Sequence, residues 1–422
     1  MKSILFVDDE PRVLNGLKRM LNAYSDRWHM EFAGGGAEAL AALASSSFDI
    51  IISDMRMPGM DGATLLHEVA RLYPQMVRII LSGTWDQDLR MRAAMVAHQY
   101  LSKPCDAKVL ESAVDRAFGL SDVLMEPALR ALVSSTTSLP SAPGIYRQLI
   151  PLLQKDDVSA RDIGTMLAKD MGMTAKVLQL VNSSFFGLSR HITNPEDAVI
   201  FLGVETVKAL AMSVSAFSCF STSKCPRFPI EGLQRHSSGV AWTAREIAKS
   251  RKVPKRFLDD TFVAGLLHDV GQLVLVSNRA TEYDKLLATI GAGDIAIVDA
   301  ERETVGTTHA EVGSYLLRLW GLPDPIVEAV AFHHAPSKCA SRDFTPLTAV
   351  YAANAMEHAL ASGTAVTDAS FDVAYLTGAG VADALPAWRS IAEQTFARHA
   401  KWLNGFFLST MNRESCKVSD AS

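Results

Sequence analysis

The sequence predicts two fold classes in one chain, a doubly wound parallel α/β sheet followed by an all-helical domain. Over residues 1–120, five short apolar runs alternate with segments in which apolar residues recur at three- and four-residue steps. Such alternation is typical of five parallel strands with helices on both faces of the sheet. From Ile145 onward nearly every segment has the helical period, so the second half is expected to consist of helices.

The five expected strands are short and mostly apolar. They are Ser3–Val7, Met30–Ala33, Ile50–Ser53, Arg78–Leu81 and Gln99–Leu101. Because a helical pattern follows each strand, the connections are expected to be crossovers, which join parallel strands.

Breaks in composition divide the chain further. Residues 139–144 read Leu-Pro-Ser-Ala-Pro-Gly, a run that ends a helix and begins a new unit. The last residues are polar and are expected to be frayed. We expect a sheet domain over 1–120, a helical linker over 121–138, a helical domain over 139–345, a helical extension over 346–411 and a tail over 412–422.

Composition indicates an ordinary globular protein of about two to three domains, because 48% of the 422 residues are hydrophobic and 21% are charged. A net charge of −5, without a basic recognition helix, argues against direct nucleic-acid binding. No apolar run reaches the roughly 18 residues of a membrane span, so no membrane contact is expected. Five cysteines without a CxxC pair favour a reducing, cytoplasmic location.

Polar side chains gather at the ends of the predicted strands. Asp8 and Asp9 follow the first strand, Asp54 the third, Ser82 the fourth and Lys103 the fifth. Parallel strands all end at one edge of a sheet, so these five side chains are expected to meet there. Carboxylates are preferred ligands of Mg²⁺, and an ammonium and a hydroxyl can bind phosphoryl oxygens. The pattern predicts a magnesium-assisted site in which Asp54 accepts a phosphoryl group.

Four segments of the first 120 residues resemble the receiver domain of two-component response regulators, which has a flavodoxin-like fold. They are FVDDEP at 6–11, SDMRMPGMDG at 53–62, ILSG at 80–83 and YLSKP at 100–104. The resemblance implies that Asp54 is the phosphoacceptor. It also implies that Asp9 binds Mg²⁺ directly, Asp8 through water, and Arg56 through its backbone carbonyl.

The same resemblance implies how phosphorylation is sensed. Ser82 has the place of the switch hydroxyl and Tyr100 that of the switch aromatic. A phosphate on Asp54 adds about two negative charges near Lys103 and Ser82. The hydroxyl then moves in, Tyr100 turns inward, and the face from the fourth helix to the fifth strand becomes a new binding surface. The implied partner is a sensor histidine kinase; a homodimer through the receiver stays open.

Histidines are the informative residues of the helical half. An isolated histidine in a helix usually completes a core, but the adjacent pair His268-Asp269 can bind one metal together with histidines of neighbouring helices. The candidate ligands are His236, His268, Asp269, His309, His333, His334 and Asn354.

Three further segments resemble the HDOD branch of the HD superfamily of metal-dependent phosphohydrolases. They are LAKDMGMTAKVLQLVNSSFFG at 167–187, ITNPEDAVIFLGVETVK at 192–208 and AGLLHDVGQLVL at 264–275. The resemblance covers residues 139 to about 360 and implies a site for a divalent transition metal such as manganese or iron.

Departures from the catalytic HD pattern leave two functions open. Asn354 stands where the last metal-binding aspartate is expected, and Gln272 replaces a lysine. The Gly-Tyr-Pro segment expected after the histidine pair is missing, which argues against cleavage of cyclic di-GMP. The chain is therefore either a response regulator whose helical domain contacts an unidentified downstream protein, or a receiver-regulated metal-dependent hydrolase of a nucleotide or other phosphoester.

Overall fold

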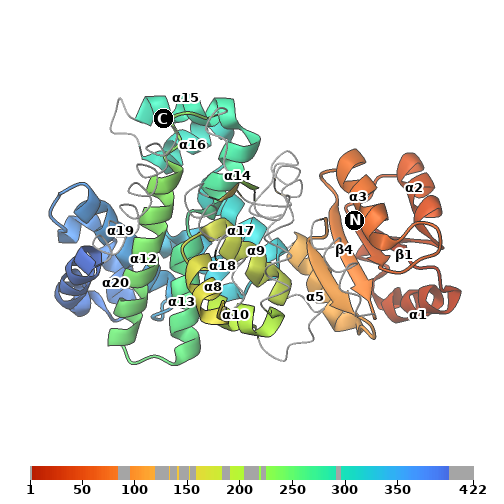
Figure 1. Cartoon of the computed structure of the whole chain (residues 1–422), viewed down its shortest axis with the longest axis horizontal. Coiled ribbons are helices and arrows are strands. Elements are labelled where there is room, and N and C mark those ends of the chain that lie inside the picture. Colours follow the sequence, from red (N-terminus) through yellow and green to blue (C-terminus); the bar gives the residue numbers. More distant parts are fainter. Residues whose placement is uncertain are drawn as a thin grey trace, which may run out of the picture.

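The computed structural model of the chain describes residues 2–83, 96–118, 133, 140–141, 152, 158–182, 191–203, 218–219, 225–290 and 296–398. Figure 1 shows the α/β domain beside a larger helical domain. Of the expected segments, most of the linker over 121–138 and the whole tail over 412–422 lie outside the described residues.

The α/β domain contains a five-stranded parallel sheet with the order β2-β1-β3-β4-β5. Its strands are β1 (Lys2–Val7), β2 (Trp28–Ala33), β3 (Ile50–Asp54), β4 (Val77–Ser82) and β5 (Gln99–Ser102). All five expected strands are confirmed, each with one or two further residues. The central residues of β1 and β3 are fully buried, as expected for strands covered on both faces.

Helices join these strands and cover the sheet. They are α1 (Pro11–Leu21), η1 (Asn22–Tyr24), α2 (Gly36–Ser45), α3 (Gly62–Leu72) and α5 (Ala107–Phe118). The helix expected between β4 and β5 lies largely outside the described residues.

Gly62, the first residue of α3, fixes how the loop after β3 returns to the sheet. A Cβ atom at this position would lie 2.0 Å from the backbone oxygen of Asp54. The Gly62 amide donates to the Met55 carbonyl at 2.9 Å, and the Asp61 side chain caps α3 by accepting from the Thr64 amide. The loop is therefore held tightly against the end of β3.

The described part of the second half is built mainly from helices. They are α8 (Ala160–Leu167), α9 (Met171–Val181), α10 (Pro195–Leu202), α12 (Ile230–Ser250), α13 (Lys255–Leu267), α14 (Val270–Asn278), α15 (Ala280–Ile290), α16 (Ile297–Val305), α17 (His309–Leu319), α18 (Asp324–Phe332), η3 (Pro336–Lys338), α19 (Pro346–Ala361), η4 (Asp368–Ser370), α20 (Val373–Gly378) and η5 (Ala382–Ala384). No described helix has the length and apolar character needed to cross a bilayer.

One short ladder departs from the all-helical expectation. Pro140–Ser141 (β6) pairs in parallel with Ser218–Cys219 (β7). A two-residue strand is too short to show an alternating pattern, so periodicity cannot detect it.

The long helix α12 packs against α13 and α19, and α19 also packs against α18. At the crossing of α12 and α13, a Cβ atom on Gly265 would lie 2.7 Å from the Cα of Ala241, so the two backbones are nearly in contact. The extension that was expected to begin at residue 346 thus contributes its first helix to the core of the helical domain.

The two domains meet through α5 and α17. The Tyr315 hydroxyl of α17 donates to the Ala117 carbonyl of α5 at 3.1 Å. The Gln179 side-chain amide of α9 donates to the His98 carbonyl, directly before β5, at 3.1 Å. Both side chains are almost fully buried, so the β5–α5 side of the sheet domain is held against the helical domain.

Glu357 of α19 gives a testable pH dependence. Its side chain is 4% exposed and accepts a hydrogen bond from the Thr243 hydroxyl at 2.7 Å. Burial raises its pKa to about 7. A carboxyl group whose pKa is higher in the folded than in the unfolded protein contributes stability at pH values below its unfolded pKa. For Glu357 this contribution is lost as pH rises through about 7. We expect Glu357→Gln to increase the free energy of unfolding by about 2 kcal/mol at pH 8 and much less at pH 5.

Urea unfolding at both pH values measures this difference. The exposed residue Glu393 supplies the control, because Glu393→Gln removes a carboxylate that is not buried. Equal gains for Glu357→Gln at pH 5 and pH 8 would contradict the interpretation.

Candidate functional site

The first candidate site lies at the edge of the sheet where β1, β3 and β5 end. Asp8 follows β1 and is 2% exposed, and Asp54 ends β3 and is 8% exposed. Lys103 follows β5; its Nζ lies 2.6 Å from Asp8 Oδ2 and also donates to Asp54 Oδ1. The expected convergence of these three strand ends is therefore present in the fold.

Backbone amides hold the same two carboxylates. The Glu10 amide donates to Asp8 Oδ1 at 2.9 Å, and the Arg56 amide donates to Asp54 Oδ2 at 2.7 Å. Burial raises the pKa of Asp54, although the hydrogen bond and charge of Lys103 offset part of that rise. Burial disfavours the charged Lys103, but its hydrogen bonds to Asp54 and Asp8 outweigh this and raise its pKa.

The remaining predicted residues lie around this centre. Asp9 is half-buried on the loop after β1. Tyr100 lies on β5 with its side chain buried, and burial raises its pKa. Ser82 ends β4 in register with Ser102, and its side chain lies outside the described part of the structure. The peptide bond between Lys103 and Pro104 is cis.

The donor set of this site fits a divalent cation. Asp8, Asp9 and Asp54 carry three negative charges, and Lys103 compensates one of them. The excess of two negative charges, carried by carboxylate oxygens, matches what Mg²⁺ requires. The backbone of Arg56 belongs to the same turn, so its carbonyl stays a candidate ligand.

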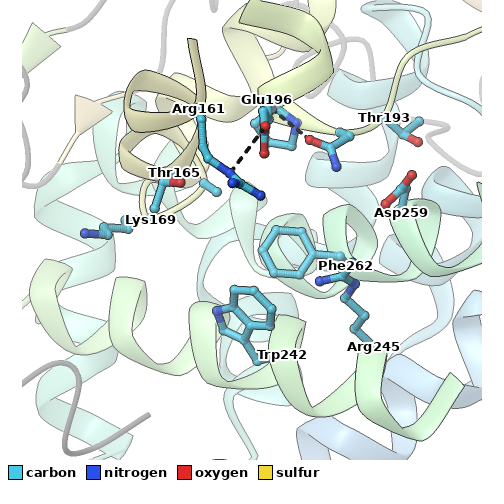
Figure 2. Close-up of a pocket in the computed structure, with 13 residues that line it drawn as sticks. Arg161, Thr165, Lys169, Thr193, Glu196, Trp242, Arg245, Asp259 and Phe262 are labelled. Carbon is cyan, nitrogen blue, oxygen red and sulfur yellow. Dashed lines mark hydrogen bonds and ion pairs between the residues drawn. The ribbon is translucent and has the colours of Figure 1, made fainter. Parts of the chain in front are cut away.

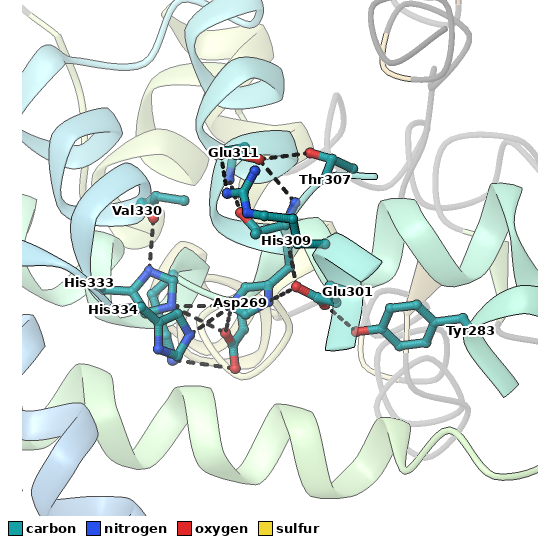
Figure 3. Close-up of polar contacts among 12 residues, drawn as sticks. Asp269, Tyr283, Glu301, Thr307, His309, Glu311, Val330, His333 and His334 are labelled. Atoms are coloured by element: carbon teal, nitrogen blue, oxygen red, sulfur yellow. Dashed lines mark hydrogen bonds and ion pairs between the residues drawn. The ribbon is translucent and has the colours of Figure 1, made fainter. Parts of the chain in front are cut away.

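The second candidate site is a cluster of histidines around Asp269 in the helical domain (Figure 3). His268 caps the C-terminus of α13, His309 begins α17, and His333 follows α18. The Nε2 atoms of His309 and His333 lie 3.1 and 3.6 Å from Asp269 Oδ1. His268 Nε2 lies 3.4 Å from Asp269 Oδ2.

Each of these three imidazoles is oriented through its Nδ1 atom. His268 Nδ1 donates to the Gly265 carbonyl at 2.7 Å and His333 Nδ1 to the Val330 carbonyl at 2.8 Å. His309 Nδ1 lies 2.7 Å from Glu301 Oε2. Anchoring one ring nitrogen aims the other at the centre, which is the usual arrangement of metal-binding histidines.

The atom His268 Nε2 supports a metal fit most directly. It is buried and has no hydrogen-bond partner among the described residues. A buried polar atom without a partner is costly, and an imidazole lone pair facing a carboxylate suits a shared cation. Imidazole nitrogens with one carboxylate form a donor set that divalent transition metals bind.

The ionisable side chains of the cluster change one another's pKa values. Burial works against ionised Asp269, but the charge of His268 and the close contacts of the Nε2 atoms of His268, His309 and His333 hold its pKa well below the usual range. Burial disfavours charged His309, but Glu301 and Asp269 outweigh this and raise its pKa to about 10. Burial lowers the pKa of His333 to about 4. The carboxylates of Glu301 and Asp269 therefore favour the protonated form of His309.

The other predicted ligands contact different members of this group. His334 Nε2 lies 3.0 Å from His309 Nε2. The ring of His236 meets that of His268 edge-on, with centroids 5.2 Å apart. His236 Nε2 lies 2.9 Å from the side-chain oxygen of Asn354. The structure thus brings all seven predicted residues into one region, with Asn354 in contact with His236.

Three residues of the cluster were not anticipated from the sequence. Glu301 is fully buried between His309 and Tyr283, whose hydroxyl donates to Glu301 Oε1 at 2.7 Å. The ring of His358 is tilted by 37° against that of His236, with centroids 4.3 Å apart. In the sequence, Glu301 lies in the polar run Glu301-Arg302-Glu303 and cannot be told from a surface residue.

Two family descriptions match the chain. The response regulator receiver domain matches residues 4–115, and the HDOD domain matches residues 139–336. The first contains the carboxylate site, and the second contains His236, His268, Asp269, His309 and His333–His334.

Similarity to curated proteins is partial. The DNA-binding transcriptional regulator NtrC of Escherichia coli strain K12 is 34% identical over 129 residues, which are 29% of this chain and 27% of that protein. An uncharacterized protein of Treponema pallidum is 26% identical over 198 residues, 46% of this chain and 37% of its own length. The chain therefore spans less than half the length of these two relatives.

Two solved structures are similar to parts of the chain. A signal receiver domain of an HD domain-containing protein from Pseudomonas fluorescens Pf-5 is 34% identical, and the match covers 29% of this chain and 98% of that one, with a TM-score of 0.28. The MmoQ response regulator from Methylococcus capsulatus strain Bath is 25% identical, with coverage of 60% and 98% and a TM-score of 0.48.

Proposed function

Because the chain is a two-component response regulator that joins a receiver domain to an HDOD domain, we propose that Asp54 accepts a phosphoryl group from a sensor histidine kinase and that the receiver thereby controls the helical domain. The contact of Lys103 Nζ with both Asp8 and Asp54 carries this proposal. This contact holds the Lys103 ammonium beside the carboxylate of Asp54, to which the phosphoryl group would be added. Labelling of the wild type and of an Asp54→Asn variant with a phosphodonor tests it.

The chemistry follows from the charges at the sheet edge. A carboxylate oxygen of Asp54 forms a bond to phosphorus while the bond from phosphorus to the kinase imidazole breaks. Asp8, Asp9, Asp54 and the Arg56 carbonyl would hold Mg²⁺, which when bound neutralises charge on the phosphoryl oxygens. Lys103 then exchanges its carboxylate partners for the new phosphoryl oxygens. Ser82 stays the proposed second donor to the phosphate, with Tyr100 responding to its movement.

The route to the helical domain runs through β5. Lys103 follows β5 directly, and His98, whose carbonyl accepts from Gln179, directly precedes it. The Tyr315 hydroxyl binds the backbone of α5, and α17 begins at His309 of the histidine cluster. A movement of β5 and α5 on phosphorylation would therefore reach α17. We propose that the helical domain then acts through contacts with a downstream protein.

The double variant Gln179→Ala with Tyr315→Phe tests this route. It removes two side-chain hydrogen bonds between the domains, each worth about 1 kcal/mol. We expect phosphodonor treatment to change amide hydrogen exchange in α17 of the wild type, and the double variant to lose at least about half of that change.

Tyr375→Phe is the matched control, because the Tyr375 hydroxyl is bonded to Thr348 within the helical domain at 2.9 Å. It should leave the response of α17 intact. A full response in the double variant would show that α9 and α17 do not carry the signal.

A second function, metal-dependent phosphoester hydrolysis, is favoured by the three Nε2 atoms directed at Asp269. His268, Asp269, His309 and His333 would hold a divalent metal such as manganese or iron, which when bound supplies a Lewis acid for hydrolysis. Metal content together with turnover of cyclic dinucleotides and generic phosphoesters separates this function from output through protein contacts.

A further inference from the structure

A separate cavity opens between α8, α10, α12 and α13 (Figure 2). Its volume is about 350 Å³, which lies within the range of small-molecule sites. None of its lining residues belongs to the carboxylate site or to the histidine cluster. Aromatic and charged side chains from these four helices line it, and their arrangement indicates what it can bind.

Two aromatic rings form one wall of the cavity. Trp242 of α12 and Phe262 of α13 meet edge-on, with ring centroids 5.0 Å apart. Figure 2 shows both rings beside the space that the other side chains surround. Aromatic walls of this kind stack on planar rings, and such stacking on a nucleobase is worth about 1–3 kcal/mol.

Two arginines from different helices approach the same space. Arg161 of α8 and Arg245 of α12 extend toward Phe262 from opposite sides (Figure 2). Arg161 Nε lies 3.6 Å from Glu196 Oε1, and the Arg161 side chain is 79% exposed, so this ion pair is loose. Arg245 lies over the Trp242 ring, 5.6 Å from its centroid. Guanidinium groups are well suited to bind phosphate oxygens in a bidentate manner.

Carboxylates complete the lining. Asp259 of α13 lies across the cavity from Arg161, and Glu196 lies on the α10 side (Figure 2). Burial raises the pKa of Asp259, while the charges of Lys255 and Arg245 and the Asn194 side chain oppose that rise. Carboxylate oxygens accept hydrogen bonds from the ring N–H and amino groups of a base. The cavity thus offers aromatic faces, cations and acceptors together, which a simple inorganic anion would not need.

We infer that this cavity binds a nucleotide, with its planar base against Trp242 and Phe262 and its phosphate between Arg161 and Arg245. The cavity is connected to the histidine cluster through α13. Phe262 lies on this helix six residues before His268, which caps its C-terminus, about 9 Å along the helix axis. A ligand held here contacts the helix that ends in the histidine cluster, without entering that cluster.

Isothermal titration of the full chain with GMP and AMP tests this inference. Guanosine, adenosine and inorganic phosphate serve as probes that lack one half of the ligand. We expect at least one monophosphate to bind with a Kd below about 1 mM, and its nucleoside and phosphate alone to bind at least about tenfold more weakly. Absence of binding by both monophosphates at that concentration would overturn the inference.

Variants locate the site. Arg161→Gln and Arg245→Gln are each expected to weaken binding by at least about tenfold, and Arg161 is exposed enough that its replacement should not disturb folding. Lys249→Gln is the control, because it removes one exposed cation from the same helix as Arg245 and should change the Kd less than twofold. Equal weakening by Lys249→Gln would indicate a general charge effect and overturn the inference. So would binding that is lost in Asp269→Asn yet kept in Arg161→Gln and Arg245→Gln, since it would place the nucleotide at the histidine cluster.

Discussion

An Asp54→Asn variant will not be labelled by acetyl phosphate in the presence of Mg²⁺, whereas the wild type will gain one phosphoryl group. The amide that replaces the carboxylate is a poor nucleophile, and it removes a negative charge that Lys103 pairs with. The Arg56 amide, which holds the acceptor side chain, and Asp8, which holds Lys103, are unchanged. Loss of labelling should therefore be complete rather than partial. Intact-protein mass spectrometry gives a direct readout.

Asp49→Asn is the matched control. Asp49 precedes the same strand at its opposite end, is exposed, and accepts a hydrogen bond from the Ser3 amide at 2.9 Å. The substitution has the same chemistry at a distance from the site, so labelling should equal that of the wild type. Undiminished labelling of Asp54→Asn would show that the acceptor is another residue, and an unlabelled wild type would remove the basis of the regulatory proposal.

The second large effect concerns metal content. We expect the purified wild type to contain about one transition-metal ion per chain, and Asp269→Asn to contain almost none. Asp269 is the carboxylate that His268, His309 and His333 all face. Replacing Asp269 removes the negative charge that offsets a dication, and it leaves the three imidazoles without a carboxylate to share the metal. Elemental analysis by mass spectrometry measures the content without relying on any activity.

Two further variants sharpen this result. Glu301→Gln keeps the shape of the residue that holds His309 Nδ1 and should weaken metal binding by about 10- to 100-fold, as expected for a residue behind a ligand. Asp299→Asn, at an exposed position on the same helix, should leave the metal content unchanged. A metal-free wild type would exclude the hydrolase, and would leave output through protein contacts as the function of the helical domain.

Much of the α/β domain follows from local pattern alone. Each strand is a short apolar run, and because parallel strands end at one edge, the convergence of Asp8, Asp54 and Lys103 could be predicted without knowing how the helices pack. The histidines could be proposed as a group for a similar reason, since the pair His268-Asp269 marks the centre and other histidines recur in later helices.

What the sequence could not provide depends on packing between distant segments. Glu301 becomes part of the histidine cluster because α16 brings it against His309, and nothing in its neighbourhood marks it as buried. Trp242 and Arg245 have the ordinary spacing of one helix, and their role emerges when α8 places Arg161 across from them. The contact of Tyr315 with α5 joins residues 198 positions apart, a separation that periodicity does not reach.

The placement of α17 has a thermodynamic consequence. Its first residue belongs to the histidine cluster, and its Tyr315 hydroxyl is bonded to the receiver. Any free energy that this helix transmits is reciprocal. If an acyl phosphate on Asp54 changes the affinity of the histidine cluster for a metal by some factor, the metal must change the equilibrium for phosphate on Asp54 by the same factor. The protein would then respond to the supply of metal and to a kinase through a single coupled equilibrium.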